Sequence, residues 1–283
     1  VDKLNRETEQ FSASSGRASY TETEKGTTVK ANGRTFVFSK KDGQLKDVSV
    51  NNRKISFANG PRFIGARRAD RSLDQFYNHD DEKAKAKDRT YSEFTDAAVF
   101  TKLDVKEEGG NLILTANYKL GNLDKAQWTI HPDGMATLDY TYNFSGVVDL
   151  MGICFDYPEE QVLSKRWLGA GPYRVWQNRI HGTQYDIWEN DYNDPIPGET
   201  FTYPEFKGYF GSVSWMSIRT KEGTISLTNE TPDSYIGVYQ PRDGRDRLLY
   251  TLPESGISVL NVIPPVRNKV NSTDLCGPSS QPK

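Results

Sequence analysis

Residues 34–50 read RTFVFSKKDGQLKDVSV, and this stretch decides the fold. Apolar and polar residues alternate on both sides of the pair Asp42-Gly43. An Asp-Gly pair between two alternating segments is a strong signal for a β-hairpin, because both residues tolerate the backbone conformation that a tight turn requires. The sequence therefore predicts a strand at Arg34–Ser39 and a return strand at Leu45–Val50.

Short alternating segments separated by turn residues continue outward from this hairpin through most of the chain. We expect further strands at residues 20–30, 54–57, 99–107, 111–119, 125–131, 135–144, 150–157, 206–209, 211–219, 224–229, 235–240 and 256–263. No sustained helical period and no internal repeat interrupts the pattern. The sequence predicts an all-β fold in which antiparallel sheets form a sandwich.

Two segments depart from the strand pattern. Residues 1–18 are polar and rich in Ser, Thr, Glu and Lys, which indicates a linker arriving from an upstream domain. Residues 60–96 are charged and lack alternation, so we expect a long loop with one short helical piece. The predicted organisation is a linker at residues 1–18 followed by a single β domain at residues 19–283.

The bulk composition narrows the possible partners. The chain carries 36 Lys and Arg residues against 38 Asp and Glu residues, a formal net charge of −2. Nucleic-acid and membrane-surface proteins show a basic bias, so the sequence predicts neither partner. No apolar run is long enough to span a membrane. Because hydrophobic content is 35%, the core depends on the large rings of the 12% aromatic residues.

The cysteines and histidines do not form a recognisable metal or disulfide pattern. Cys154 lies in an apolar run and is expected to be a small buried hydrophobe, whereas Cys276 lies in a polar tail. A disulfide between them is possible if the tail folds back. His79, His131 and His181 are widely spaced, and His131 precedes a Pro-Asp-Gly turn. The sequence predicts no metal site and no other cofactor.

Aromatic residues concentrate in residues 166–190, RWLGAGPYRVWQNRIHGTQYDIWEN, which contain three of the five tryptophans. Rings, turns and interleaved charged or amide groups are what a carbohydrate-facing surface needs, because sugars present both apolar C–H faces and hydroxyls. The alternative is that the rings pack between two sheets. We expect Trp167 to lie in the core.

Part of this stretch resembles a known family signature. Residues 168–188, LGAGPYRVWQNRIHGTQYDIW, are similar to the GxGPxENYxDRxxG signature in the C-terminal domain of family 2 glycoside hydrolases of the β-galactosidase type. The matching positions are Gly169, Gly171, Pro172, Asn178, Arg179 and Gly182, with Trp176 where the family tends to have Tyr. Residues 36–55, 60–70 and 203–218 resemble further family segments in the same order.

The resemblance implies a large antiparallel β-supersandwich similar to galactose-mutarotase domains. The catalytic glutamates of such enzymes lie on a separate upstream barrel, so the resemblance implies a non-catalytic accessory domain that packs on that barrel. Its expected partners are the upstream catalytic domain of the same parent chain and a carbohydrate, either a galactoside or a plant or host glycan. No signal peptide is visible, and for the parent protein we favour a periplasmic or extracellular location.

The resemblance and the aromatic pattern together select candidate residues for carbohydrate binding. These are Arg174, Trp176, Asn178, Arg179, Trp188 and Glu205. None of them is expected to be catalytic. Two alternatives stay open. The chain could be a free-standing carbohydrate-binding module, or an aldose epimerase or lyase that uses His181 with Glu189 or Glu205.

Overall fold

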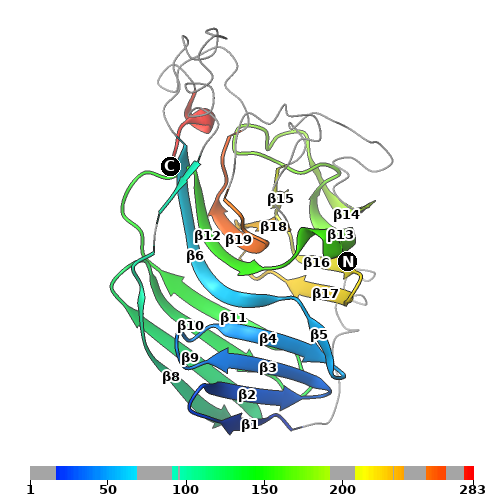
Figure 1. Ribbon diagram of the computed structural model, residues 1–283. Coiled ribbons are helices and arrows are strands. Elements are labelled where there is room, and N and C mark those ends of the chain that lie inside the picture. The colour runs from blue at the N-terminus through cyan, green and yellow to red at the C-terminus, as the bar shows by residue number, and fades with distance from the viewer. Residues whose placement is uncertain are drawn as a thin grey trace. The chain divides into compact units, whose positions relative to one another are not determined.

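The computed structural model describes residues 17–68, 91–94, 96–191, 208–231, 233–238, 253–265 and 277–283. Their regular structure consists of antiparallel β-strands and two short 3-10 turns, η1 (Glu159–Gln161) and η4 (Pro278–Ser280) (Figure 1). The prediction of an all-β, antiparallel, sandwich-like fold is confirmed. No helix in the described ranges is long and apolar enough to cross a membrane.

The chain divides into two compact units. The first comprises Val1–Pro61 and Asp96–Phe144, and the second comprises Arg62–Thr95 and Ser145–Lys283. Of the linker predicted at residues 1–18, the structure describes residues 17 and 18. The single domain predicted for residues 19–283 stays a prediction.

The first unit contains two antiparallel sheets whose strands follow the order of the sequence. One sheet holds β1 (Ser19–Glu22), β2 (Gly26–Ala31), β3 (Arg34–Ser39) and β4 (Leu45–Val50), with β5 (Arg53–Ile55) also paired to β4. The other holds β8 (Val99–Glu108), β9 (Asn111–Lys119), β10 (Leu123–Ile130) and β11 (Ala136–Tyr142). The hairpin predicted at residues 34–50 is therefore confirmed with the expected bounds.

One strand prediction in this unit is wrong. Residues 20–30 form two strands, β1 and β2, instead of one. The chain reverses because the backbone N–H and the hydroxyl of Thr23 both donate to the carbonyl of Gly26, at 2.9 and 3.1 Å. Gly26 is the one usual turn residue in Thr23–Gly26, and no Pro, Asn or Asp accompanies it.

The core of the first unit is formed by the apolar side chains that alternate with polar ones along its strands. Phe38 of β3 and Trp128 of β10 are buried, and their ring centroids lie 6.0 Å apart. Leu112 and Leu114 of β9 are buried on the same side of their strand, as a period of two requires. Fully burying such a side chain stabilises the fold by about 1.5–3 kcal/mol.

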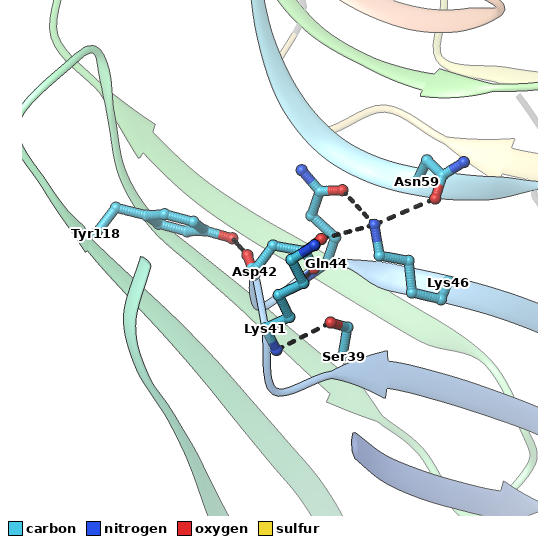
Figure 2. A network of polar contacts seen from close by, with 7 residues as sticks. All are labelled: Ser39, Lys41, Asp42, Gln44, Lys46, Asn59 and Tyr118. Atoms are coloured by element: carbon cyan, nitrogen blue, oxygen red, sulfur yellow. Dashed lines mark hydrogen bonds and ion pairs between the residues drawn. The ribbon is translucent and has the colours of Figure 1, made fainter. Parts of the chain in front are cut away.

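A polar network fixes the β3–β4 turn (Figure 2). The ammonium of Lys46 contacts Asp42 Oδ2 at 2.8 Å, Gln44 Oε1 at 2.9 Å and Asn59 Oδ1 at 3.2 Å. The hydroxyl of Tyr118 donates to the backbone carbonyl of Asp42 at 2.9 Å. Burial raises the pKa of the Asp42 carboxyl, but hydrogen bonds from Lys46 and the backbone of Gln44 outweigh it, so the net pKa is lowered.

The second unit joins strands that are distant in the sequence. One series of paired strands is β12 (Leu150–Asp156), β19 (Ile257–Val262), β18 (Tyr235–Gly237) and β15 (Phe210–Gly211). A four-stranded sheet has the order β14 (Gln184–Asp191), β13 (Val162–Gly171), β16 (Trp215–Thr220) and β17 (Gly223–Thr228). The strand β6 (Ala58–Arg68) pairs with β7 (Tyr91–Glu93) at its carboxyl end.

The prediction of a loop throughout residues 60–96 is therefore wrong at both ends. Residues 60–68 belong to β6 and residues 91–93 form β7, while residues 69–90 lie outside the described part of the chain. Phe63, Ile64 and Ala66 are buried in β6. The sequence did not reveal this strand, because several arginines lie next to its apolar residues and make the segment look charged.

Aromatic contacts hold the core of the second unit. Trp167 is 0% exposed and lies edge-on to Phe210, with ring centroids 4.9 Å apart, so its predicted place in the core is confirmed. Trp176 lies edge-on to Tyr209 at 5.7 Å. Cys154 is buried in this core, as predicted, and its thiol is free, whereas Cys276 lies outside the described residues.

Candidate functional site

The loop between β13 and β14, residues 172–183, is called the signature loop, and glycines set the positions of the chain around it. A Cβ atom at Gly171 would lie 2.4 Å from the ring of Trp188, so only glycine lets this ring pack across the strand. The indole N–H of Trp188 also donates to the carbonyl of Gly169 at 3.2 Å. Gly182 has a φ of +93°, a conformation that disfavours other residues.

Residues 174–177 of the signature loop are buried. Arg174 is 2% exposed and Trp176 is 1% exposed. Between them, Val175 and Tyr209 exchange two backbone hydrogen bonds of 2.7 and 2.8 Å. Burial raises the pKa of Tyr209, and the positive charge of Arg174 partly opposes this rise. Because Trp176 is covered by protein, its ring cannot stack on a ligand unless the fold opens.

The middle of the signature loop is tied to the end of the chain. The backbone N–H of Gln177 donates to the carbonyl of Pro264 at 3.1 Å, and its side-chain amide donates to the carbonyl of Gln281 at 2.9 Å. Asn178 Nδ2 donates to Ser280 Oγ at 3.3 Å. Sequence reasoning missed these contacts, because the polar tail that contains Cys276 gave no pairing signal.

The tip of the loop faces solvent. Arg179 and His181 are exposed, and Ile180 between them is 38% exposed. The backbone N–H of Arg179 donates to the carbonyl of Trp176 at 2.8 Å, which turns the chain outward at this point. The loop therefore has a buried, hydrogen-bonded base and a short exposed tip of mixed polar and apolar character.

The predicted site residues fall into distinct environments. The loop gathers Arg174, Trp176, Asn178 and Arg179, and it brings Trp188 of the following strand against Gly171. Trp188 and Asn178 are half-buried. Glu205 lies outside the described residues, so the structure neither joins it to this group nor separates it. The binding role of the set stays a prediction.

His181, Glu189 and His131, which were considered for epimerase chemistry or metal binding, lie in separate parts of the described chain. His181 is exposed on the loop tip and Glu189 is exposed on β14. His131 flanks the turn expected at residues 132–134, where the backbone N–H of Gly134 donates to its carbonyl at 2.9 Å. Within the part of the chain that the structure describes, no three His, Cys, Asp or Glu residues gather as ligands for a metal ion.

The outer face of the β14–β13–β16–β17 sheet carries a second group of residues that the sequence did not single out as a site. The guanidinium carbon of Arg166 lies 5.6 Å from the ring centroid of Trp215. The hydroxyl of Tyr185 lies 2.6 Å from Ser214 Oγ. Arg166 lies on β13 and Trp215 on β16, whereas Tyr185 lies on β14 and Ser214 immediately precedes β16, so only the pairing of these strands reveals the two contacts.

Comparison with known families agrees with the resemblance seen in the sequence. A family model described as Beta galactosidase small chain matches residues 30–259. The match includes all four strands of the β14–β13–β16–β17 sheet and the signature loop. No curated protein matches the chain significantly.

Proposed function

Because the chain belongs to the β-galactosidase small chain family, we propose that it is the accessory, non-catalytic part of a β-galactosidase. In this role it packs against the catalytic barrel of the parent enzyme and contributes contacts to the bound galactoside. Family membership supports association with a catalytic part. The carbohydrate contacts are our own extension, and they rest on the signature loop.

The observation that carries the proposal is the contrast between the base and the tip of the signature loop. Hydrogen bonds from Gln177 and Asn178 to Pro264, Ser280 and Gln281 hold the base, whereas Arg179 and His181 reach solvent. A fixed base lowers the entropy that the tip must lose when it meets a partner or a sugar. The guanidinium of Arg179 offers several donors in a planar arrangement, which suits sugar hydroxyls and carboxylates.

Reconstitution tests the proposal. The chain is mixed with the catalytic part of a β-galactosidase from which the corresponding region has been removed, and hydrolysis of o-nitrophenyl β-D-galactoside is followed. We expect the chain alone to give no turnover, and the mixture to co-elute in size-exclusion chromatography and to hydrolyse the substrate faster than the catalytic part alone. Robust hydrolysis by the isolated chain, or failure to associate, contradicts the proposal.

The role of the loop tip is tested in the same assay. We expect Arg179→Ala to raise KM about tenfold without changing association, because about 1.4 kcal/mol is the size of one lost hydrogen bond to a charged group. Arg53→Ala is the matched control, since Arg53 is an exposed arginine on β5 of the other unit. Equal KM values for the two variants would remove Arg179 from the site.

A further inference from the structure

Tyr185 combines high exposure with a fixed hydroxyl. Its side chain is 56% exposed, more than the 44% of Tyr20, the other tyrosine with a large exposed surface among the described residues. Its hydroxyl nevertheless lies 2.6 Å from Ser214 Oγ. An exposed tyrosine normally samples several rotamers, and a hydrogen bond at the far end of the ring restricts that freedom.

The strand register shows where this ring must lie. Tyr185 on β14 is directly opposite Ala170 on β13, so both side chains point to the same face of the sheet. Ser214 lies on the other side of β13, because its backbone N–H donates to the carbonyl of Leu168 at 2.9 Å. The Tyr185 side chain therefore crosses β13 above Ala170, whose small methyl group leaves room for a ring lying along the sheet.

One face of the ring is consequently turned to the sheet and the other to solvent. The neighbouring positions on this face are Leu168, Ile187 and Trp215, which are directly opposite one another across the three strands. The guanidinium carbon of Arg166 lies over the Trp215 ring, 5.6 Å from its centroid. The Tyr185 ring is therefore held at its strand and at its hydroxyl, with Ser214 as the polar group at its rim.

We propose that the ring of Tyr185 is a stacking platform for the pyranose ring of a carbohydrate, a binding site separate from the signature loop. Flat rings with polar borders suit sugars, because C–H groups cover the ring while hydroxyls bond to its rim. β-Galactopyranose presents three C–H groups on one face. The choice of galactose rests on the proposed function, whereas the platform itself rests on the geometry of Tyr185, Ala170 and Ser214.

Saturation-transfer NMR with methyl β-D-galactopyranoside and the full chain tests the site. We expect Tyr185→Ala to weaken binding about tenfold, the size of one lost aromatic contact. Tyr185→Phe keeps the ring and loses the hydroxyl, and Ser214→Ala keeps the ring and loses its anchor, so both should weaken binding by about threefold or less. Tyr20→Ala, which removes an exposed tyrosine from β1, should leave binding unchanged.

The outcomes separate this proposal from the proposed function. Unchanged saturation transfer in Tyr185→Ala, equal losses in Tyr185→Ala and Tyr20→Ala, or no transfer to the unmodified chain overturns the platform. In the reconstitution assay, Tyr185→Ala should associate with the catalytic part as the unmodified chain does. Loss of association in Tyr185→Ala would make this face a protein interface and would also overturn the platform, while leaving the accessory role intact.

Discussion

The two units use the same kind of strand but connect the strands differently. In the first unit, β1 to β4 pair in sequence order, and so do β8 to β11. In the second unit, β13 pairs with β14 on one side and with β16 on the other, and β12 pairs with β19. Local pairing needs only short turns, whereas distant pairing brings together side chains from separate stretches of sequence.

The exposed side-chain contacts of the two units also differ in how far apart their residues lie in the sequence. On β8 of the first unit, the exposed side chains of Lys102 and Asp104 form an ion pair of 2.7 Å with each other. On the sheet of the second unit, Tyr185 meets Ser214 across an intervening strand. In this case the contact joins two residues that are 29 positions apart in the sequence. This difference places the candidate binding surfaces in the second unit.

The largest expected effect is on the core of the second unit. Trp167→Ala removes a fully buried ring that packs on Phe210, and should lower the free energy of unfolding by about 3–5 kcal/mol. Lys102→Ala on β8 is the control, because an exposed ion pair contributes less than about 1 kcal/mol. Calorimetry and denaturant unfolding measure both changes.

The same experiment tests the single domain predicted for residues 19–283. If the two units unfold together, Trp167→Ala lowers the temperature of one common transition. If the units unfold separately, it lowers one of two transitions and leaves the other unchanged. An effect no larger than that of Lys102→Ala would contradict the place of Trp167 in the core.

The difference between the units also explains what the sequence could predict. The bounds of β3, β4 and β9 were predicted correctly, because alternation and turn residues are local signals. The end of the chain was not predicted, since the two backbone hydrogen bonds between Val148 and Lys283 depend on the fold as a whole. No local pattern marks two residues that are so far apart in the sequence.

The candidate site was predictable to a smaller extent than the fold. The glycines of residues 168–188 pointed to the signature loop, and the structure explains Gly171 by its contact with Trp188. The sequence could not show that Trp176 is buried, because tryptophan occurs both in protein cores and on binding surfaces. Tyr185 lies in that stretch, but its partner Ser214 is 29 residues further along the chain.

A smaller effect on stability than that of Trp167→Ala is expected at the base of the signature loop. Gln177→Ala removes the hydrogen bond to Gln281 and should cost about 1 kcal/mol, mostly as local opening of residues 172–183. Hydrogen–deuterium exchange should show faster exchange in this loop, with little change on β10 and β13. Gln127→Ala on β10 is the matched control, since the side-chain oxygen of Gln127 accepts a long hydrogen bond of 3.4 Å from Thr115 within the same sheet. Unchanged exchange in Gln177→Ala would show that other contacts hold the loop.

The smallest effect is expected in the locally paired unit, at the β3–β4 turn. The folded pKa of Asp42 is lowered, so its carboxylate stabilises the fold at pH values above its unfolded pKa, near about 4. That stability is lost as the pH falls through the lower folded pKa. Because the carboxyl is partly exposed, the contribution at neutral pH should be below about 1 kcal/mol.

Unfolding of the unmodified chain and of Asp42→Asn, measured between about pH 2 and pH 7, tests this sign. The two curves should differ most at neutral pH and converge at the acid end. In a Lys46→Met background the difference should shrink, because Lys46 provides the main opposing interaction to the cost of burying the carboxyl. A difference that grows toward low pH would show that the carboxyl destabilises the turn. A difference that survives unchanged without Lys46 would assign the effect to the backbone of Gln44, and the turn would then be stabilised by purely local contacts.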